Sequence, residues 1–509
     1  MRGMTDLLVC ESSGECQLKE SLKSSGHSES GAATLDPGDW SSFRMLAHAT
    51  LDDCIDYIAS VRERPVWQPV PGEVLATLRG PVPYRPTALP ALVEEIRDKI
   101  MPFATGNVHP RFFGWVHGAG TVAGILAELM AATMNSNCGG RDHAAIYVER
   151  QVIEWCREIF GFPAGGSGVL TVGTSMAAVI AVATARVSRL GAAVRADGHT
   201  GTGSRLVGYS SAEGHVSLRK AFELVGIGNA QLRAIPTLPD HSMCLERLAA
   251  AIRADRAAGL EPFLIIGTAG TVNTGAFDRL DAIADLARHE CLWFHVDGAF
   301  GAWAKIAGHP WHDLVRGIER ADSLAFDFHK WISVPYDAGC VLIRDAHRHR
   351  AAFAERPDYL ATGARGLAAG DPWPCDYGID LSRGFRALKA WITLRHYGLA
   401  QLGRVIAKNC RSAVYLGKLV EESEQFELAA PVSLNICCFC LKGARTIGSD
   451  DAVITQLAEE IQLSGIAAPS TTRIGARLCV RVAILNHRTT DNDVEMLFKS
   501  ACEILRDLN

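Results

Sequence analysis

Two segments in the middle of the chain carry the residues best suited to chemistry. Asp297 ends a largely apolar run that begins at Cys291, and Lys330 follows a second apolar run, between His329 and Trp331. A carboxylate buried at the end of such a run costs several kcal/mol unless a cation or hydrogen-bond donors meet it. Lysine is rarely buried without a partner, and lysines that form a Schiff base are the known exception. The two segments therefore predict a reactive amine and an acid that meets a cation.

Pyridoxal phosphate is a cofactor that needs this pair of groups. A lysine amine forms the Schiff base with the cofactor aldehyde, and an acid keeps the pyridine nitrogen protonated so that the ring can accept electrons. A carboxylate beside the pyridine raises the pyridine pKa because opposite charges stabilise each other. The other role open to Asp297 is a structural cap for the residues from Gly298 onward.

Two further motifs gain meaning beside this pair. The run Leu170–Met176 contains Gly173, Thr174 and Ser175 and leads into an alanine-rich helix, where backbone N–H groups suit a phosphate. Small residues at a tight turn between a strand and a helix are also common without any ligand. His215 follows a strand and opens a helix, and it is either a surface cap or an imidazole stacked on a flat cofactor.

Strand-like and helical stretches alternate from about residue 114 to residue 343. Such alternation predicts an α/β fold with a mostly parallel sheet covered on both faces, whose ligands bind beyond the carboxyl ends of the strands. The expected strands are Gly168–Val172, Leu206–Ser210, Phe263–Thr268, Leu292–Asp297, Ser323–Phe328 and Gly339–Ile343. The expected helices are Ala177–Leu190, Val216–Val225, Leu245–Ala258 and Leu280–Arg288.

The whole chain divides into four expected regions. These are a disordered arm (1–38), a helical and extended wrapping segment rich in proline (39–113), a large cofactor-binding domain (114–395) and a smaller α+β domain (396–509). Helices are expected from Trp40 to about Ile58, at Ala91–Ile100 and, leading into the small domain, at roughly Arg383–Tyr397. The cysteine-rich run Cys437–Cys440 is interpreted as part of a buried strand rather than as a metal site.

The composition of the chain indicates which binding partners and which cellular compartment to expect. A net charge of −5 gives no electrostatic reason to expect nucleic acid or an anionic membrane as a partner. No uninterrupted apolar stretch is long enough for a transmembrane helix, and the N-terminal arm lacks the apolar core of a secretory signal. Fifteen scattered cysteines in a chain of 509 residues fit free thiols in a reducing cytoplasm better than a disulfide scaffold.

Together these segments resemble the group II pyridoxal-phosphate-dependent amino-acid decarboxylases, which include the aromatic amino-acid, glutamate, histidine and cysteine-sulfinate decarboxylases. The likeness extends from about Trp40 to the C-terminus. The resemblance implies a fold-type-I homodimer with its active sites at the subunit interface and pyridoxal 5′-phosphate as cofactor. The motifs that carry it, in family order, are His109–Gly114, Leu170–Met176, Gly267–Asp278, His295–Ala299, Asp327–Trp331, Leu381–Lys389 and Arg481–Thr490.

The resemblance also implies a role for each matching residue. Lys330 is expected to form the Schiff base, Asp297 to meet the pyridine nitrogen, and His215 to stack on the ring. The other expected cofactor contacts are Ala299 on the opposite ring face, Thr271, the phosphate turn of Gly173, Thr174 and Ser175, and the polar residues Asp327 and His329, which would touch phosphate and substrate respectively.

Two features of the resemblance bear on substrate and product. The segment that meets substrate side chains in this family is Phe113, Trp115, Val116 and His117 here, and Trp115 is placed to stack on an aromatic substrate. In the family, a tyrosine on a mobile loop returns a proton to the substrate carbon. Either Tyr377 has taken over that proton transfer, or another group such as His329 performs it, or the product is not a simple amine.

The expected activity is that of a cytoplasmic L-amino-acid α-decarboxylase that slightly favours aromatic substrates. An aldehyde-forming decarboxylase–oxidase, a transaminase and a decarboxylase of acidic or other non-aromatic amino acids share the same cofactor residues. The run Gly118–Gly124 resembles a dinucleotide-binding glycine turn, with one residue too many before its third glycine. A scaffold that has lost catalysis is the remaining alternative.

Overall fold

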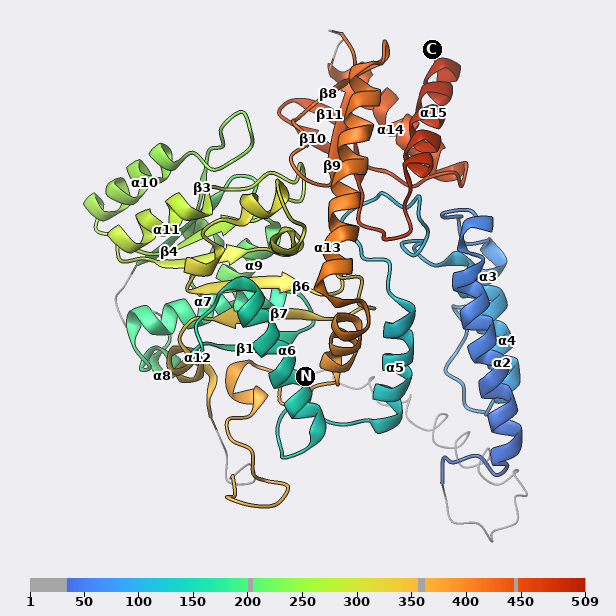
Figure 1. Ribbon diagram of the computed structural model, residues 1–509, viewed down its shortest axis with the longest axis horizontal. Coiled ribbons are helices and arrows are strands. Elements are labelled where there is room, and N and C mark those ends of the chain that lie inside the picture. Colours follow the sequence, from blue (N-terminus) through green and yellow to red (C-terminus); the bar gives the residue numbers. More distant parts are fainter. Residues whose placement is uncertain (1–33, 200–204, 356–361, 444–446, 509) are drawn as a thin grey trace, which may run out of the picture. The chain divides into compact units, whose positions relative to one another are not determined.

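The computed structural model describes residues 34–199, 205–355, 362–443 and 447–508 (Figure 1). The chain divides into two compact units, Met1–Asp56 and Tyr57–Asn509. Most of helix α2 (Trp40–Ala59) belongs to the first unit, and its bounds confirm the helix expected from Trp40 to about Ile58. Nearly all of the arm expected at residues 1–38 lies outside the described residues.

A seven-stranded sheet forms the centre of the second unit, in the order β1-β7-β6-β5-β4-β2-β3. Strand β7 is antiparallel to both of its neighbours, and the other six strands all run in one direction. The mostly parallel sheet expected from the sequence is therefore confirmed. The strands are β1 (Ser167–Thr171), β2 (Leu206–Ser211), β3 (Leu232–Ile235), β4 (Glu261–Thr268), β5 (Trp293–Asp297), β6 (Ser323–Asp327) and β7 (Gly339–Ile343).

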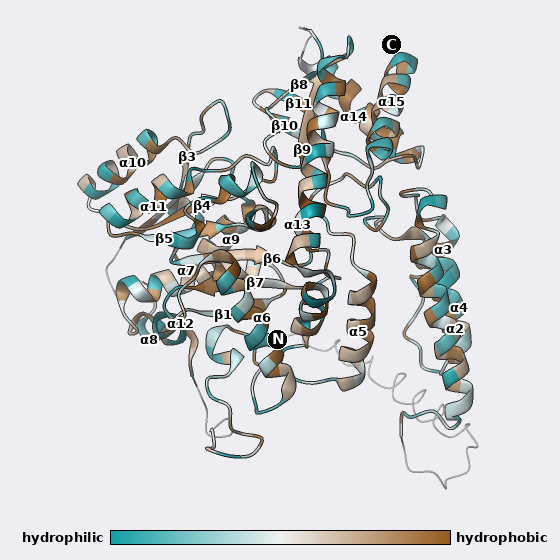
Figure 2. Cartoon of the chain, in the orientation of Figure 1, coloured by the Kyte–Doolittle hydropathy of each residue, from teal (hydrophilic) through white to brown (hydrophobic). Residues whose placement is uncertain are grey.

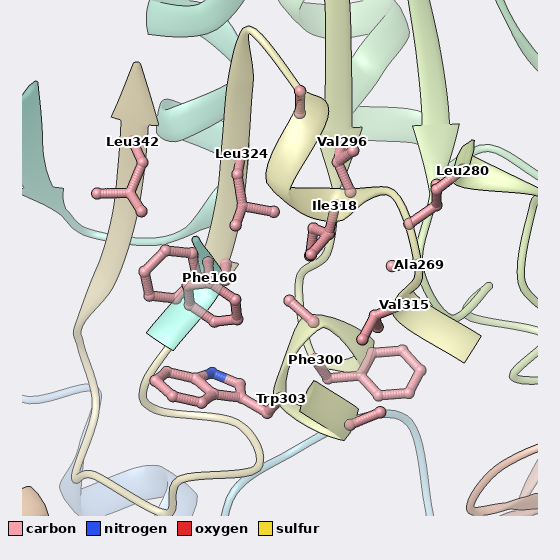
Figure 3. Close-up of a cluster of buried hydrophobic side chains, with 14 of the residues drawn as sticks. Phe160, Ala269, Leu280, Val296, Phe300, Trp303, Val315, Ile318, Leu324 and Leu342 are labelled. Atoms are coloured by element: carbon pink, nitrogen blue, oxygen red, sulfur yellow. The ribbon is translucent and has the colours of Figure 1, made fainter. Parts of the chain in front are cut away.

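Alternate residues of the strands pack into two separate hydrophobic clusters, one on each face of the sheet. On β4, Ile265 packs into one cluster, whereas Leu264 and Ile266 pack into the other. Figure 3 shows part of the first cluster, where side chains of neighbouring strands project toward the rings of Phe300 and Trp303. Helices α6, α10, α11 and α13 contribute to the first cluster and helices α7 and α9 to the second, so both faces are covered as expected.

The helices agree with the expected pattern where a prediction was made, with ends shifted by a few residues in every case except the long helix α13. The α-helices after α2 are α3 (Gly72–Thr77), α4 (Leu89–Lys99), α5 (Val122–Met134), α6 (Ala144–Phe160), α7 (Thr174–Leu190), α8 (Val194–Asp197), α9 (Val216–Leu224), α10 (Leu245–Ala257), α11 (Leu280–His289), α12 (Ala346–Phe353), α13 (Arg386–Glu421), α14 (Ile447–Leu463) and α15 (Asp491–Leu508). Short 3-10 helices are η1 (Val61–Glu63), η2 (Met101–Phe103), η4 (Asn229–Gln231), η5 (Gly301–Ile306), η6 (Trp311–Val315), η7 (Ile318–Arg320) and η9 (Pro374–Tyr377).

A second, antiparallel sheet follows the long helix α13, with the strand order β10-β11-β9-β8. Cys437 and Cys440 lie on its strand β9 and are buried, which confirms their interpretation as part of a buried strand. Helix α13 is much longer than expected and departs from helical geometry at Gly398 (φ 69°), close to the expected boundary between 395 and 396. The strands are β8 (Phe426–Leu428), β9 (Ile436–Leu441), β10 (Ser470–Ile474) and β11 (Arg477–Ala483).

Helix α5 differs from the other helices in its composition. Figure 2 shows it coloured on the hydrophobic side of the scale for most of its length. Its apolar residues Val122, Leu126, Leu129, Met130 and Met134 are each about half exposed. Among the described residues, no helix is long and apolar enough to span a membrane.

Candidate active site

The residues expected to do chemistry meet at one edge of the large sheet. Asp297 is the last residue of β5, Asp327 is the last residue of the neighbouring strand β6, and the turn at Gly173 follows β1. Because β1, β5 and β6 run in the same direction, their carboxyl ends lie at the same edge. This is the edge at which parallel sheets bind ligands.

Asp327 connects the start of helix α7 to Lys330. Its Oδ1 accepts a hydrogen bond from the Thr174 N–H at 2.8 Å, and its Oδ2 accepts one from the Thr174 hydroxyl at 3.0 Å. The same Oδ2 lies 3.1 Å from Lys330 Nζ. The structure thus brings the expected phosphate turn and the expected reactive amine together around one buried carboxylate.

Asp297 is a buried acid that forms no ion pair with any of the described residues. Burial raises its pKa, although His215 and Lys330 each act to lower it, and the Ala299 N–H donates to Oδ1 at 3.3 Å. A buried carboxylate of this kind is stabilised when a cation reaches it. A protonated pyridine nitrogen is such a cation, so the environment of Asp297 fits the predicted cofactor.

His215 performs one of its two alternative roles within the chain. It is the N-cap of helix α9, since its Nδ1 accepts a hydrogen bond from the Ser217 N–H at 3.2 Å. Partial burial lowers its pKa, and the Asp297 carboxylate acts in the opposite direction. His215 is thus a helix cap at the same edge of the sheet as Asp297, and its expected stacking on the cofactor remains a prediction.

The phosphate turn is shaped by close backbone packing. A Cβ atom added to Gly339 would lie 2.5 Å from the Gly173 Cα, and one added to Gly173 would lie 3.3 Å from His329 Cε1. Only glycine fits both positions without displacing its neighbours. Helix α7 begins at Thr174, whose N–H already donates to Asp327, and Ser175 in its first turn is exposed, so an anion at this helix N-terminus would be met at Ser175.

His329 has a defined tautomer in its neutral form. Its Nδ1 accepts a hydrogen bond from the Ala338 N–H at 3.1 Å, so the proton of a neutral ring must be on Nε2. That Nε2 lies 3.6 Å from Asp327 Oδ2. Burial lowers the pKa of His329, which favours this neutral form.

Thr271 and Ala299 lie close to the site, but their described contacts are internal to the fold. The Thr271 hydroxyl is buried, lies 3.0 Å from the Thr274 hydroxyl and accepts a hydrogen bond from the Ala276 N–H. The Ala299 carbonyl accepts a hydrogen bond from the Asp327 N–H at 2.9 Å, which ties β6 to the residues after β5. Their expected contacts with the cofactor remain predictions.

The four residues expected to meet the substrate fall into two pairs. Phe113 is fully buried in the hydrophobic core of the small sheet, and Val116 is buried in the core of the large sheet. Trp115 is 56% exposed, and its ring stacks on His117 with centroids 5.7 Å apart. Burial lowers the pKa of His117, and the nearby charge of Lys330 lowers it further. Trp115 and His117 are therefore better placed to meet a substrate than Phe113 and Val116.

Two aromatic residues extend this surface and were missed in the sequence. Phe112 stacks on His117 with centroids 5.8 Å apart and planes at 10°. Tyr336 lies 4.4 Å from His329 and 6.1 Å from His117, measured between ring centroids. The position of Tyr336 shortly after Lys330 was the available signal, because residues close in sequence to the reactive lysine can pack against the same site.

Tyr377 lies away from Lys330 within the chain. Its ring packs 4.9 Å from the ring of His349, whose Nδ1 lies 2.9 Å from the Ser167 hydroxyl. Ser167 is the first residue of β1, whereas the phosphate turn follows the last. The structure does not bring Tyr377 together with Lys330, and its expected role in catalysis remains a prediction.

The run Gly118–Gly124 does not form a dinucleotide-binding turn. Residues 113–121, all of which are described, form no strand, and Thr121 caps helix α5 through a hydrogen bond from the Gly124 N–H. A Cβ atom on Gly118 would lie 2.0 Å from the His329 carbonyl oxygen, so this glycine permits close packing on the segment that carries Lys330. The alternative based on this run lacks the strand that it requires.

Comparison with known proteins agrees with this geometry. The model of the pyridoxal-dependent decarboxylase conserved domain matches residues 71–442. Tyrosine decarboxylase 4 of Petroselinum crispum is 32% identical over 92% of this chain and 93% of its own length. The 4-hydroxyphenylacetaldehyde synthase of Rhodiola rosea is 28% identical over 92% of this chain and 95% of its own length. The crystal structure of Oryza sativa TDC with PLP and tryptamine superposes with a TM-score of 0.83 and 28% identity, covering 93% of this chain and all of that chain.

The chain therefore belongs to the pyridoxal-dependent decarboxylase family. It is a carboxy-lyase that uses pyridoxal 5′-phosphate to decarboxylate an amino acid, and its fold is that of the pyridoxal-phosphate decarboxylases. The resemblance inferred from the sequence motifs is confirmed.

Proposed function

We propose that this enzyme decarboxylates an L-amino acid with an aromatic side chain and releases CO2 and the corresponding amine. The observation that carries the proposal is the group of packed rings of Trp115, His117 and Tyr336, with the buried Phe112 stacked on His117. Tyr336 packs against His329, the residue before Lys330. Aromatic rings favour stacked or edge-to-face contacts with one another. The tyrosine decarboxylase and the tryptamine-bound structure among the similar proteins support the same class of substrate.

The cofactor would be held by residues at the ends of four strands, β1, β2, β5 and β6. Lys330 would bind its aldehyde carbon, Asp297 would keep its ring nitrogen protonated, and His215 would stack on the ring. The N–H groups at the start of α7 would bind its phosphate, through the turn of Gly173, Thr174 and Ser175. When bound, pyridoxal phosphate accepts the electron pair left on the substrate carbon by the loss of CO2.

Asp327 is proposed to orient the reactive amine, and His329 to act on a proton near the substrate carbon. Asp327 holds Lys330 Nζ at 3.1 Å and so orients the amine that the substrate must displace. The Nδ1 of His329 accepts a hydrogen bond from the Ala338 N–H, so Nε2 carries the proton of the neutral ring. This Nε2 lies 3.6 Å from Asp327 Oδ2, the same oxygen that contacts Lys330. We infer that His329 returns a proton to the substrate carbon. Tyr377 could do so only from another position of its segment or in the active site of a second subunit.

We further propose a homodimer in the cytoplasm. The half-exposed apolar side chains along helix α5 provide a continuous face that a second copy would cover. The described cysteines are all free thiols, several of them buried, which fits a reducing compartment.

A second candidate function is oxidative decarboxylation to an aldehyde. The observation that favours it is the distance of Tyr377 from the site within one chain, together with the aldehyde synthase among the relatives.

One experiment separates amine formation from aldehyde formation. Purified enzyme is supplied with each proteinogenic amino acid, and CO2, amine, aldehyde and hydrogen peroxide are measured together. Amine without peroxide from tyrosine, tryptophan or phenylalanine supports the first proposal, and equal aldehyde and peroxide would support the second. Turnover confined to glutamate or other non-aromatic amino acids would contradict the aromatic substrate class.

A further inference from the structure

A buried ion pair lies against the strand that carries the phosphate turn. Glu149 of helix α6 and Arg383, shortly before helix α13, each have a side chain only 2% exposed. Two hydrogen bonds of 2.6 and 3.1 Å join the guanidinium to the two carboxylate oxygens. Paired bonds of this kind fix orientation as well as distance. Arg383 belongs to the motif Leu381–Lys389, and the site described above does not include it.

Both charged groups also bind the backbone of Leu170. The Leu170 N–H donates to Glu149 Oε1 at 3.1 Å, and the Leu170 carbonyl accepts from Arg383 Nη2 at 2.7 Å. Leu170 lies on β1, which is at the edge of the sheet formed by the described residues and pairs there with β7. Buried backbone groups on the outer side of an edge strand need other partners. The ion pair provides them at a point just before Gly173.

The inner side of the phosphate turn is held by different contacts. Gly339 of β7 packs directly on Gly173, and Asp327 accepts the Thr174 N–H. The turn is thus fixed between β7 and Asp327 on one side and Glu149 with Arg383 on the other. If the outer support were lost, β1 and the first turn of α7 would be free to move away from Asp327.

Net stability alone is a poor explanation for this ion pair. Replacing a buried ion pair by neutral side chains of similar volume is often neutral or stabilising, because desolvation offsets the attraction between the charges. Burial lowers the pKa of Arg383, but the Glu149 carboxylate outweighs this effect and the pKa is raised, so the arginine stays charged. Arg383 Nη1 also donates to the Cys138 carbonyl at 2.8 Å, so one side chain fixes two chain segments. Such an arrangement is suited to accurate positioning.

We propose that Glu149 and Arg383 are positioning residues for the cofactor phosphate. They hold β1 in place so that the N–H groups at the start of α7 point at the phosphate, while they touch neither cofactor nor substrate. Displacements near 1 Å at a binding site are enough to cost on the order of a hundredfold in function. The proposal depends on the cofactor of the family and is independent of the substrate.

The test compares cofactor binding by two double variants. Glu149→Gln with Arg383→Met removes both charges at once and leaves no unpaired buried ion. The dissociation constant for pyridoxal 5′-phosphate is measured by equilibrium dialysis, and the phosphorus NMR signal of the bound cofactor is recorded. We expect the dissociation constant to rise at least tenfold and the phosphorus signal to shift toward that of the free cofactor.

The opposite edge of the same sheet offers a matched control. Arg233 of strand β3 pairs with Asp255 at 3.1 Å, far from the phosphate turn in strand order. Arg233→Met with Asp255→Asn should change the melting temperature but keep the dissociation constant within twofold and leave the phosphorus signal unchanged. If the Glu149 and Arg383 double variant behaves like this control, the pair is merely structural and the proposal is wrong.

A conservative variant keeps the test decisive if the double variant does not fold. Lysine in place of Arg383 retains the charge but cannot reach Glu149, Leu170 and Cys138 together. Arg383→Lys should fold and still bind pyridoxal 5′-phosphate several times more weakly. Unchanged affinity and an unchanged phosphorus signal in Arg383→Lys would overturn the proposal.

Discussion

The Asp327 carboxylate contacts both the Thr174 N–H, at 2.8 Å, and Lys330 Nζ, at 3.1 Å. Thr174 begins helix α7, and Lys330 follows strand β6, so the phosphate turn and the reactive amine share one positioning group. Glycine at position 339 lets β7 pass close enough for this arrangement. The ends of strands β1 and β6 therefore set the distance between the groups that would hold the two ends of the cofactor.

Borohydride reduction of the cofactor-loaded enzyme should attach the cofactor to Lys330. The amine is held in the site by Asp327, and its side chain is 21% exposed, so a ligand can reach it. Peptide mapping by mass spectrometry locates the modified lysine. Lys389 serves as an internal comparison, because it is buried but paired with Glu128. Modification of Lys389, or of any lysine other than 330, would contradict the assignment.

Replacing Asp297 by asparagine should lower kcat by several orders of magnitude. The fold should persist because asparagine has nearly the same shape, but the charge that stabilises a protonated ring nitrogen is lost. Asp322→Asn is the matched control, since Asp322 is also a partly buried acid, accepting the Phe294 N–H at the opposite end of the strands. Turnover is measured on both variants after confirming that the cofactor is bound. A loaded Asp297→Asn enzyme with near-normal kcat would remove this role.

Strand ends and motifs were the most predictable parts of this protein. The apolar runs predicted the strands Leu292–Asp297 and Ser323–Phe328, which the structure shows to be the neighbours β5 and β6. The parallel direction of β1 brings Gly173 to the same edge. Strand β3 was missed because its four residues include Arg233 and lack a long apolar run. The ion pair of Glu149 with Arg383 could not be found from spacing, because the two residues are distant in sequence and only the tertiary fold brings them together.

Removing the Trp115 side chain should weaken binding of aromatic substrates. Trp115 is exposed beside His117, and a lost aromatic contact is worth about 1.4 kcal/mol, or roughly tenfold in kcat/KM. Trp115→Ala is compared with Trp311→Ala, which changes a tryptophan on η6 that packs against the core of the large sheet. Steady-state kinetics with tyrosine and tryptophan provide the measurement. Equal losses in the two variants would show that Trp115 makes no specific contact with the substrate.

A charge on the apolar face of helix α5 should separate the proposed dimer. Leu129 is 55% exposed in one chain, and burying a glutamate against a second copy would be unfavourable. Leu129→Glu is compared with Leu224→Glu, which changes a leucine that is 73% exposed at the end of α9. Light scattering should give a dimer for the wild type and for Leu224→Glu, and a monomer for Leu129→Glu. A wild-type monomer, or an intact Leu129→Glu dimer, would exclude this face as the interface.

Acid should destabilise the fold partly through His349. Complete burial lowers its pKa from 6.5 to about 3, and its Nδ1 lies 2.9 Å from the Ser167 hydroxyl. Because the unfolded chain takes up a proton below pH 6.5 and the folded chain does not, this histidine makes folding less favourable as the pH falls from 6.5 toward 3. At pH 5 the effect is about 2 kcal/mol for one group.

His349→Phe should reduce this pH dependence. Phenylalanine has no titratable group and would pack beside Phe353 and Tyr377, whose rings already contact the imidazole. The free energy of unfolding is measured by urea denaturation at pH 7.5 and pH 5.0, and His289→Phe, at an exposed position on α11, is the control. The difference between the two pH values should be smaller by about 2 kcal/mol in His349→Phe and unchanged in the control. The same pH dependence in His349→Phe and in the wild type would mean that this histidine is already protonated in the folded protein at pH 5, against the effect of its burial.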